Sequence, residues 1–181
     1  MAPRELIQKI HNIKLIVSDV DGILTDGSII ISSNGDEMKK FHVEDGMGVA
    51  LASFANLPIA FLSGRYSETT TIRARELKIK YCYQGQLNKV VGLQQLCENY
   101  NVDYEEVCYI GDGLIDIPPM EKCGLAVTVP NAQTLTKEIA DYITTKSGGT
   151  GVLSELIEWI LTHQDRFEES LEKMRKEVYQ K

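Results

Sequence analysis

The stretch "IVSDVDGILTDG" (residues 16–27) places two aspartates, Asp19 and Asp21, at the end of an apolar run and follows them at once with Gly22. The apolar run is typical of a buried strand, and the glycine indicates a sharp bend where the strand gives way to a loop. Because two carboxylates this close repel each other, a positive group is expected between them. The stretch therefore predicts a strand end that holds a cation.

The length and composition favour one globular domain over residues 1–181. Of these residues, 43% are hydrophobic and 25% are charged, and the formal net charge is -7. A nucleic acid or an anionic membrane surface would need a basic face on the protein, so neither is expected as a partner. An anionic substrate would have to be met by a few local cations.

The cysteines and the apolar runs indicate a cytoplasmic protein. None of the four cysteines forms a C-x-x-C pair, and neither disulfides nor a zinc site are expected of Cys82, Cys97, Cys108 and Cys123. No apolar run approaches the roughly 18 residues that a membrane span needs. Residues 1–12 also lack the continuous apolar core of a signal peptide.

Strand-like runs alternate with helical segments along the chain. Strands are predicted within residues 13–20, 58–64, 79–84, 106–112, 124–129 and 141–144. Apolar residues at helical spacing predict helices within residues 45–56, 67–77, 88–100 and 134–140. Several strand runs are apolar throughout, which is typical of strands covered on both faces. We therefore expect an α/β fold, with a doubly wound, mainly parallel, Rossmann-like sheet.

Residues 28–42 interrupt this alternation with two strand-like arms around Asn34-Gly35, a dipeptide suited to a type I′ turn. We expect a β-hairpin that projects beyond the first strand. No insertion is long enough to form a separate cap domain, so the site is either open or covered by a neighbouring subunit.

The segment 164–181 predicts a C-terminal helix with one apolar stripe. The stripe consists of Phe167, Leu171, Met174 and Val178, spaced by four, three and four residues. This helix could pack on its own domain or on another subunit, and the sequence favours neither alternative.

Polar residues follow the predicted strands where ligands bind in doubly wound sheets, beyond the carboxyl ends. Asp19 and Asp21 follow the first strand, and "SGR" (residues 63–65) follows the second. Asp112 and Asp116 come after "VCYI", and Lys89 opens the helix after the third strand; all of these residues are expected to meet in one crevice.

The expected crevice suits phosphoryl transfer. Asp19, Asp21 and Asp112 offer hard oxygen ligands to magnesium. Asp19 can act as the nucleophile that forms an aspartyl-phosphate. Asp21 can protonate the leaving alcohol and then activate water.

Charge compensation would come from the remaining residues of the crevice. Ser63 and the amide that follows it at Gly64 can hold phosphate oxygens, Lys89 can neutralise charge, and Gly22 lets the backbone approach closely. A phospho-accepting module of receiver type is the alternative from another class. Such a module does not need Asp21, so the D-x-D order favours an enzyme.

These stretches resemble the haloacid dehalogenase superfamily of phosphatases. Its four motifs match "DVDGILTDG" (19–27), the serine of "LSGR" (62–65), the lysine of "GQLNK" (85–89) and "GDGLID" (111–116). Over residues 13–160 the sequence is similar to a branch of the superfamily without a lid, which acts on phosphorylated sugar acids.

This resemblance implies a role for each matching position. Asp19 would be the nucleophile and Asp21 the acid/base. Magnesium would be bound by the side chains of Asp19 and Asp112 and by the backbone carbonyl of Asp21, with Asp116 supporting its ligand shell. The remaining site residues would hold phosphate or substrate: Ser63, Lys89, Gly22, Gly64 and Arg65.

The same resemblance implies a homotetramer in which a neighbouring subunit completes each site. The expected substrate is a phosphorylated eight-carbon 2-keto-3-deoxy sugar acid of lipopolysaccharide precursor synthesis, with a nine-carbon relative as the alternative. Relatives often carry arginine where Glu44 and Ser154 stand here, and a second acid where Gly113 stands. These departures leave the exact sugar open.

Overall fold

A computed structural model describes residues 4–179, and the side chains of residues 4–177. Its centre is a six-stranded sheet in the order β5-β4-β1-β6-β7-β8, in which every neighbouring pair is parallel. The strands are β1 (Leu15–Ser18), β4 (Ile59–Leu62), β5 (Cys82–Tyr83), β6 (Val107–Ile110), β7 (Leu125–Thr128) and β8 (Tyr142–Ile143).

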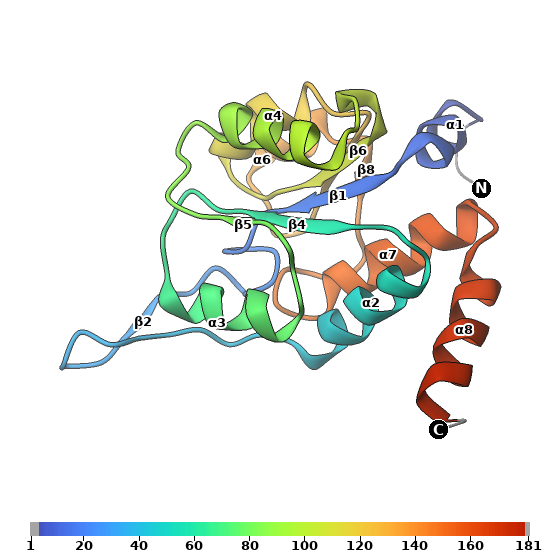
Figure 1. Cartoon of the computed structure of the whole chain (residues 1–181). Helices are drawn as coiled ribbons and strands as arrows, with labels where there is room; N and C mark the ends of the chain where they lie inside the picture. The colour runs from blue at the N-terminus through green and yellow to red at the C-terminus, as the bar shows by residue number, and fades with distance from the viewer. Residues whose placement is uncertain (1–3, 180–181) are drawn as a thin grey trace.

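Helices cover both faces of this sheet (Figure 1). One face carries α1 (Arg4–Asn12), α2 (Val43–Phe54), α3 (Glu68–Glu76), α7 (Val152–His163) and α8 (Phe167–Tyr179). The other carries α4 (Lys89–Tyr100), α5 (Ile117–Met120) and α6 (Thr134–Ile139). Two 3₁₀ helices, η1 (Tyr104–Glu106) and η2 (Leu114–Asp116), flank β6.

The central strand shows why its sequence is apolar throughout. Ile16 packs into the core on the α2 and α7 side, whereas Leu15 and Val17 pack into the core on the α4 side. Successive side chains of a strand point to opposite faces, so a strand covered on both faces needs apolar residues at every position. The predicted doubly wound, mainly parallel sheet is therefore confirmed.

The predicted elements are present, although α2 begins at Val43, two residues before its predicted segment. Each of the six strand-like runs contains one strand of the sheet, and the four helical segments correspond to α2, α3, α4 and α6. The helices α1, α5 and α7 lie outside those segments. None of the helices described between residues 4 and 179 is both long and apolar enough to cross a bilayer.

The expected hairpin is formed by β2 (Ile30–Ile31) and β3 (Glu37–Met38), which pair antiparallel. It projects from the body of the molecule near the carboxyl end of β1 (Figure 1). Within residues 4–179 no further segment forms a cap domain over the sheet.

The hairpin turn differs from the predicted type I′. That type needs positive φ at both central residues, but Gly35 has φ 88° and Asn34 is not among the residues with positive φ. The Ser32 N–H donates to the Asp36 carbonyl at 2.9 Å, and the Gly35 N–H donates to the Ser32 carbonyl at 3.0 Å. The Ser32 hydroxyl also accepts the amides of Asn34 and Asp36, which favours this longer loop.

The C-terminal helix α8 packs on its own domain. Phe167, Leu171 and Met174 lie partly buried against the core that α2 and α7 also line. This is one of the two arrangements that the apolar stripe left open. The fourth stripe residue, Val178, lies outside the described side chains, as does the end of the predicted tail at residues 180–181.

Candidate active site

A pocket of about 470 Å³ lies at the carboxyl ends of the strands. It brings together residues that follow three strands: Asp19 after β1, Ser63 after β4 and Asp112 after β6. Its other lining residues are Asp21, Gly27, Ile29, Gly64, Arg65, Leu87, Gly113, Ile115 and Asp116. A larger apolar pocket beside Val49 and Leu77 contains none of the predicted site residues.

Asp19 is buried and paired with a buried lysine. Its side chain accepts the Val20 N–H at 2.7 Å through Oδ1, and Nζ of Lys89 lies 2.9 Å from Oδ2. Asp19 is 6% exposed and Lys89 is 1% exposed. Burial and the nearby charge of Asp116 raise the pKa of Asp19 to about 8, although Lys89 opposes this shift.

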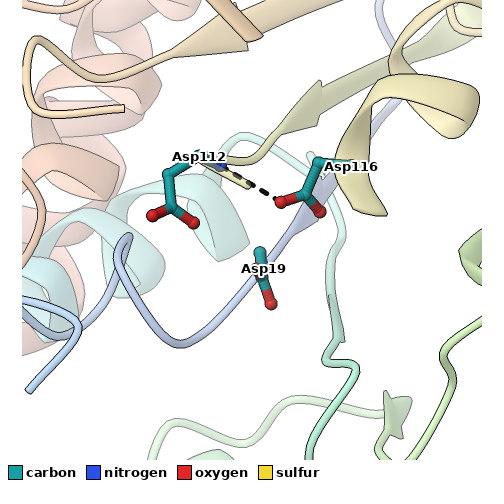
Figure 2. Close-up of side chains that lie close together, drawn as sticks. All are labelled: Asp19, Asp112 and Asp116. Atoms are coloured by element: carbon teal, nitrogen blue, oxygen red, sulfur yellow. Dashed lines mark hydrogen bonds between the residues drawn. The ribbon is translucent and has the colours of Figure 1, made fainter. Parts of the chain in front are cut away.

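Asp116 anchors the loop that follows β6. Its Oδ1 accepts Nζ of Lys89 at 2.5 Å and the Tyr109 hydroxyl at 2.7 Å. Its Oδ2 accepts the backbone amides of Asp112 at 3.2 Å and Gly113 at 2.9 Å, the first of which is drawn in Figure 2. Burial disfavours the Lys89 charge, but the flanking carboxylates outweigh that cost and raise the pKa of Lys89.

Three carboxylates lie close together (Figure 2). Asp19, Asp112 and Asp116 each offer an oxygen, and these oxygens lie within 4.8 Å of one another. Burial and the charge of Asp116 raise the pKa of Asp112 to about 6. Carboxylate oxygens crowded in this way fit a small divalent cation such as Mg²⁺, which would relieve their repulsion.

The loop at Gly22 fits closely against this cluster. Gly22 has φ 90°, and a Cβ at this position would lie 2.1 Å from Oδ2 of Asp112. A larger residue would therefore be strained and would also displace the carboxylate. Thr25 Oγ1 accepts the amides of Gly22 at 3.3 Å and Gly27 at 3.2 Å, which holds the loop in its bend.

The segment "GGTG" (residues 148–151) covers the other side of the loop. A Cβ at Gly148 would lie 1.8 Å from the Gly22 carbonyl oxygen, so only glycine fits there. Gly149 has φ 74°, and its N–H donates to the carbonyl of Ile23 at 2.9 Å. The residues that follow β8 therefore fix the loop that follows β1.

Asp21 lies on the hairpin side of the pocket. Its Oδ1 accepts Nζ of Lys39 at 2.6 Å, and its Oδ2 is buried without a hydrogen-bond partner. Lys39 immediately follows the hairpin strand β3. The two aspartates of the D-x-D stretch therefore have different surroundings, since Asp19 faces Lys89 and Asp21 faces Lys39.

The residues after β4 form the third wall. The Ser63 hydroxyl donates to the Arg65 carbonyl at 3.0 Å and accepts the Arg65 N–H at 3.3 Å. A Cβ at Gly64 would lie 2.6 Å from Cδ1 of Ile115, so the chain passes close to the opposite wall. Arg65 Nη2 lies 2.6 Å from Oε2 of Glu37 on the hairpin.

The structure thus brings the predicted site residues together and adds three that sequence reasoning missed: Glu37, Lys39 and Tyr109. Tyr109 carried a usable signal, because a tyrosine within a buried strand needs a partner for its hydroxyl. The opposite charges of Glu37 and Lys39 were also visible in the predicted hairpin, but no pattern indicated which residues they contact.

Glu44 and Ser154 stand apart from the pocket-lining residues. Glu44 Oε2 lies 2.5 Å from Nζ of Lys146, and both side chains are exposed. The Ser154 N–H donates to Oδ1 of the buried Asp45 at 3.3 Å. Neither position supplies a cation to the pocket of its own subunit.

The chain belongs to the haloacid dehalogenase-like hydrolases. The model of that family matches residues 59–156, which include the predicted Ser63, Lys89 and Asp112. The chain is a phosphoric monoester hydrolase of this family, in agreement with the prediction of a phosphatase.

Particular relatives are more specific. The 3-deoxy-D-manno-octulosonate 8-phosphate phosphatase of Escherichia coli strain K12 is 40% identical over 166 residues, covering 92% of this chain and 88% of the relative. A crystal structure of the Moraxella catarrhalis phosphatase of the same name, in complex with magnesium, phosphate and KDO, is 39% identical. It has a TM-score of 0.89, covering 93% of this chain and 97% of the other.

A hydrolase of the same superfamily from Legionella pneumophila has a TM-score of 0.92 at 37% identity. The match covers 95% of this chain and 94% of that one. These solved structures therefore share the fold over nearly their whole lengths.

Proposed function

We propose that the protein hydrolyses 3-deoxy-D-manno-octulosonate 8-phosphate to the free sugar acid and phosphate, with magnesium, in lipopolysaccharide precursor synthesis. The observation that carries the proposal is the buried pairing of Asp19 with Lys89 beside Asp112, in a chain 40% identical to phosphatases of that name. The phosphatase of a nine-carbon relative is the second candidate, because arginine is missing at Glu44 and Ser154.

Asp19 is the nucleophile in this proposal. The Val20 amide holds one of its oxygens, and Lys89 neutralises charge beside the other. Attack of the carboxylate on phosphorus breaks the bond to the sugar oxygen and forms an aspartyl-phosphate, which water then hydrolyses. The buried surroundings strengthen every charge interaction along this path.

Asp21 serves as the acid and then the base. Lys39 binds one of its oxygens, while the other is buried without a hydrogen-bond partner. The unpartnered oxygen can deliver a proton to the leaving alcohol and later accept one from the attacking water. Ser63 and the Gly64 amide hold phosphate oxygens with Lys89, and Arg65 faces the sugar acid.

The carboxylates of Asp19 and Asp112 and the backbone carbonyl of Asp21 would hold the magnesium ion. When bound, the ion neutralises phosphate charge and the repulsion between the carboxylates. Asp116 supports this shell from behind, since Lys89, Tyr109 and two amides already use both of its oxygens.

A substrate panel tests the function. The rates of phosphate release from the eight-carbon acid phosphate, its nine-carbon relative and a neutral hexose phosphate are compared with magnesium and with EDTA. We expect the highest kcat/KM for the eight-carbon acid and loss of activity in EDTA. A higher value for the nine-carbon acid would favour the second candidate, and equal hydrolysis of the neutral sugar would reject both.

We also propose a homotetramer in the cytoplasm, with neither a nucleic acid nor a membrane as a partner. The hairpin exposes a set of large apolar side chains, as surfaces buried between subunits do: Ile29, Ile30, Ile31 and Met38. Sedimentation at micromolar concentration should give four subunits. Deletion of residues 28–38 should reduce both assembly and activity, and a fully active monomer would contradict the proposal.

A further inference from the structure

The second arm of the hairpin directs two charged side chains into the site of its own subunit. Glu37 lies in β3 and Lys39 follows two positions later, the spacing that puts side chains on the same side of an extended segment. Glu37 meets Arg65, and Lys39 meets Asp21. The hairpin thus contacts both a proposed substrate-binding residue and the proposed acid/base.

Lys39 is buried and pairs most closely with Asp21, while Oε1 of Glu37 lies farther away, at 3.7 Å from its Nζ. The Lys39 side chain is 2% exposed, and Nζ lies 2.6 Å from Asp21 Oδ1 and 3.2 Å from Thr70 Oγ1. A buried ammonium is stable only when it is paired, so these contacts fix both partners. With Oδ1 of Asp21 held, the rotation of this carboxylate is restricted and its unpartnered Oδ2 is kept in one direction.

Glu37 holds Arg65 by one edge. Its Oε2 lies 2.6 Å from Nη2 of Arg65, whereas Nη1 of Arg65 is buried without a hydrogen-bond partner. The guanidinium carries five N–H donors, so the ion pair on Nη2 does not use all of them. Glu37 therefore orients Arg65, whose side chain is 41% exposed and lines the pocket.

The arm is also attached to the body of the same subunit. The Thr69 hydroxyl donates to the Glu37 carbonyl at 3.2 Å, and Thr70, which contacts Lys39, lies next to it at the start of α3. These contacts tie the arm to the helix that follows Arg65. The positions of Glu37 and Lys39 are thus fixed within one chain.

We infer that Lys39 and Glu37 are positioning residues of the phosphatase reaction, Lys39 acting through Asp21 and Glu37 through Arg65. The inference deepens the proposed function and rests on it. The two residues should affect different steps. Lys39 should affect the departure of the leaving alcohol, whereas Glu37 should affect the binding of the sugar acid.

The first experiment compares Lys39→Met with Lys40→Met on two substrates. Lys40 is the matched control because its side chain is 73% exposed and lies 3.7 Å from Asp26. The substrates are the sugar acid phosphate and p-nitrophenyl phosphate, whose leaving group departs without protonation. For Lys39→Met, we expect kcat/KM to fall about 10-fold or more on the sugar phosphate and less than about 3-fold on p-nitrophenyl phosphate.

Lys40→Met should stay within about 2-fold on both substrates, the usual range for exposed positions. Lys39→Arg keeps the buried positive charge and is therefore the control against misfolding. Its kcat/KM should also fall more on the sugar phosphate than on p-nitrophenyl phosphate, but by a smaller factor than in Lys39→Met. An equal loss on both substrates in these Lys39 variants, or no loss at all, would overturn the role of Lys39.

The second experiment is a double-mutant cycle of Glu37→Gln and Arg65→Ala. In the single variant Glu37→Gln, KM for the sugar acid phosphate should rise about 5-fold with little change in kcat, whereas the neutral hexose phosphate is unaffected. In the Arg65→Ala background the same change should have no further effect. The role of Glu37 is overturned if Glu37→Gln still raises KM in the Arg65→Ala background, or if it does not raise KM when Arg65 is present.

The substrate preference of the wild-type protein shows whether a negative result contradicts this inference or the proposed function. If the wild type prefers the sugar acid and Glu37→Gln has the same KM for it as the wild type, the role of Glu37 fails and the proposed function stands. If the wild type does not distinguish the acid from the neutral sugar, the substrate assignment fails. The Lys39 comparison still holds in that case, because it can be measured on any alkyl phosphate that the enzyme hydrolyses.

Discussion

The floor and the rim of the pocket are built differently. The floor consists of Asp19, Lys89, Tyr109 and Asp116, all buried and connected by charged hydrogen bonds. The rim contains Arg65, which is 41% exposed and receives its partner from the projecting hairpin. Charges interact strongly in the floor because water is excluded, whereas at the rim they are screened.

This difference separates the reaction from the choice of substrate. The floor is assembled from β6, the residue that follows β1, and the starts of the segments that lead away from β5 and β6, so its geometry depends on the core of the domain. The rim depends on a short antiparallel hairpin outside that core. Changes in the floor should therefore reduce turnover for every phosphate ester, while changes at the rim should alter which ester is preferred.

The largest expected effect tests the floor directly. Asp19→Asn keeps the shape of the side chain but removes the attacking carboxylate, so kcat should fall by about 10⁴-fold or more, the scale on which loss of a nucleophile acts. The fold should persist, as checked by circular dichroism. Turnover close to that of the wild type in a magnesium-saturated assay would show that the reaction does not start in the floor.

The next effect tests the loop between floor and rim with a matched pair of glycines. Gly22→Ala would place Cβ 2.1 Å from Oδ2 of Asp112, whereas Gly35→Ala has a similar φ of 88° and nothing within 4 Å. Both variants therefore strain the backbone, but only Gly22→Ala also brings Cβ into a clash with Asp112. We expect kcat/KM to fall about 100-fold for Gly22→Ala, as misplacement by about 1 Å can cause, and little for Gly35→Ala. Similar losses in both would point to strain alone.

The third effect is the pH dependence of stability in the metal-free protein. The pKa is raised to about 8 for Asp19 and to about 6 for Asp112, above the ordinary value of 3.8, so the folded protein binds more protons than the unfolded chain between pH 4 and 8. The free energy of unfolding should then fall as pH rises through this range. Magnesium should raise the melting temperature more at pH 8 than at pH 6, because its ligands must be ionised.

The control for this titration is Asp19→Asn, which removes one of the two carboxylates and should flatten the pH dependence. Thermal unfolding followed by circular dichroism, with EDTA or magnesium, gives both measurements. A melting temperature of the EDTA-treated wild type that rises from pH 6 to pH 8 would contradict the raised pKa values of Asp19 and Asp112.

The smallest effect lies outside the pocket. Glu44 and Lys146 form an exposed ion pair, and such pairs add little to stability because water and salt screen them. Glu44→Gln should change the melting temperature by no more than about 1 °C and leave kcat unchanged. A large loss of activity would mean that this surface contributes to the site in the assembled protein.

The contrast between floor and rim also explains what the sequence could predict. The runs around Leu15–Ser18 and Val107–Ile110 are apolar at every position, which identifies strands covered on both faces. Such strands are parallel, so the residues at their carboxyl ends, Asp19 and Asp112, had to lie close together. That rule predicted that Asp19 and Asp112 meet in the pocket, without knowledge of any side-chain contact, although Tyr109 of the floor was missed.

The rim could not be predicted in the same way. The partners of Glu37 and Lys39 depend on how the hairpin bends toward the sheet, and no local periodicity encodes that direction. The turn at Asn34-Gly35 shows the same limit, since the Ser32 hydroxyl selects a longer loop than the dipeptide alone suggests. Similarly, the apolar stripe of α8 predicted a buried face of the helix but not which surface this face packs against.

Gly148 and Gly149 pack on the loop at Gly22, so this loop gains its support only after most of the chain has been synthesised. The ribosome adds Gly148 more than a hundred residues after Gly22, so a nascent chain exposes its catalytic loop without this support for most of its synthesis. A product of interrupted translation that ends before residue 148 would contain every proposed catalytic side chain and still lack the contacts that support the loop at Gly22. We therefore expect a fragment that ends before Gly148 to lack activity.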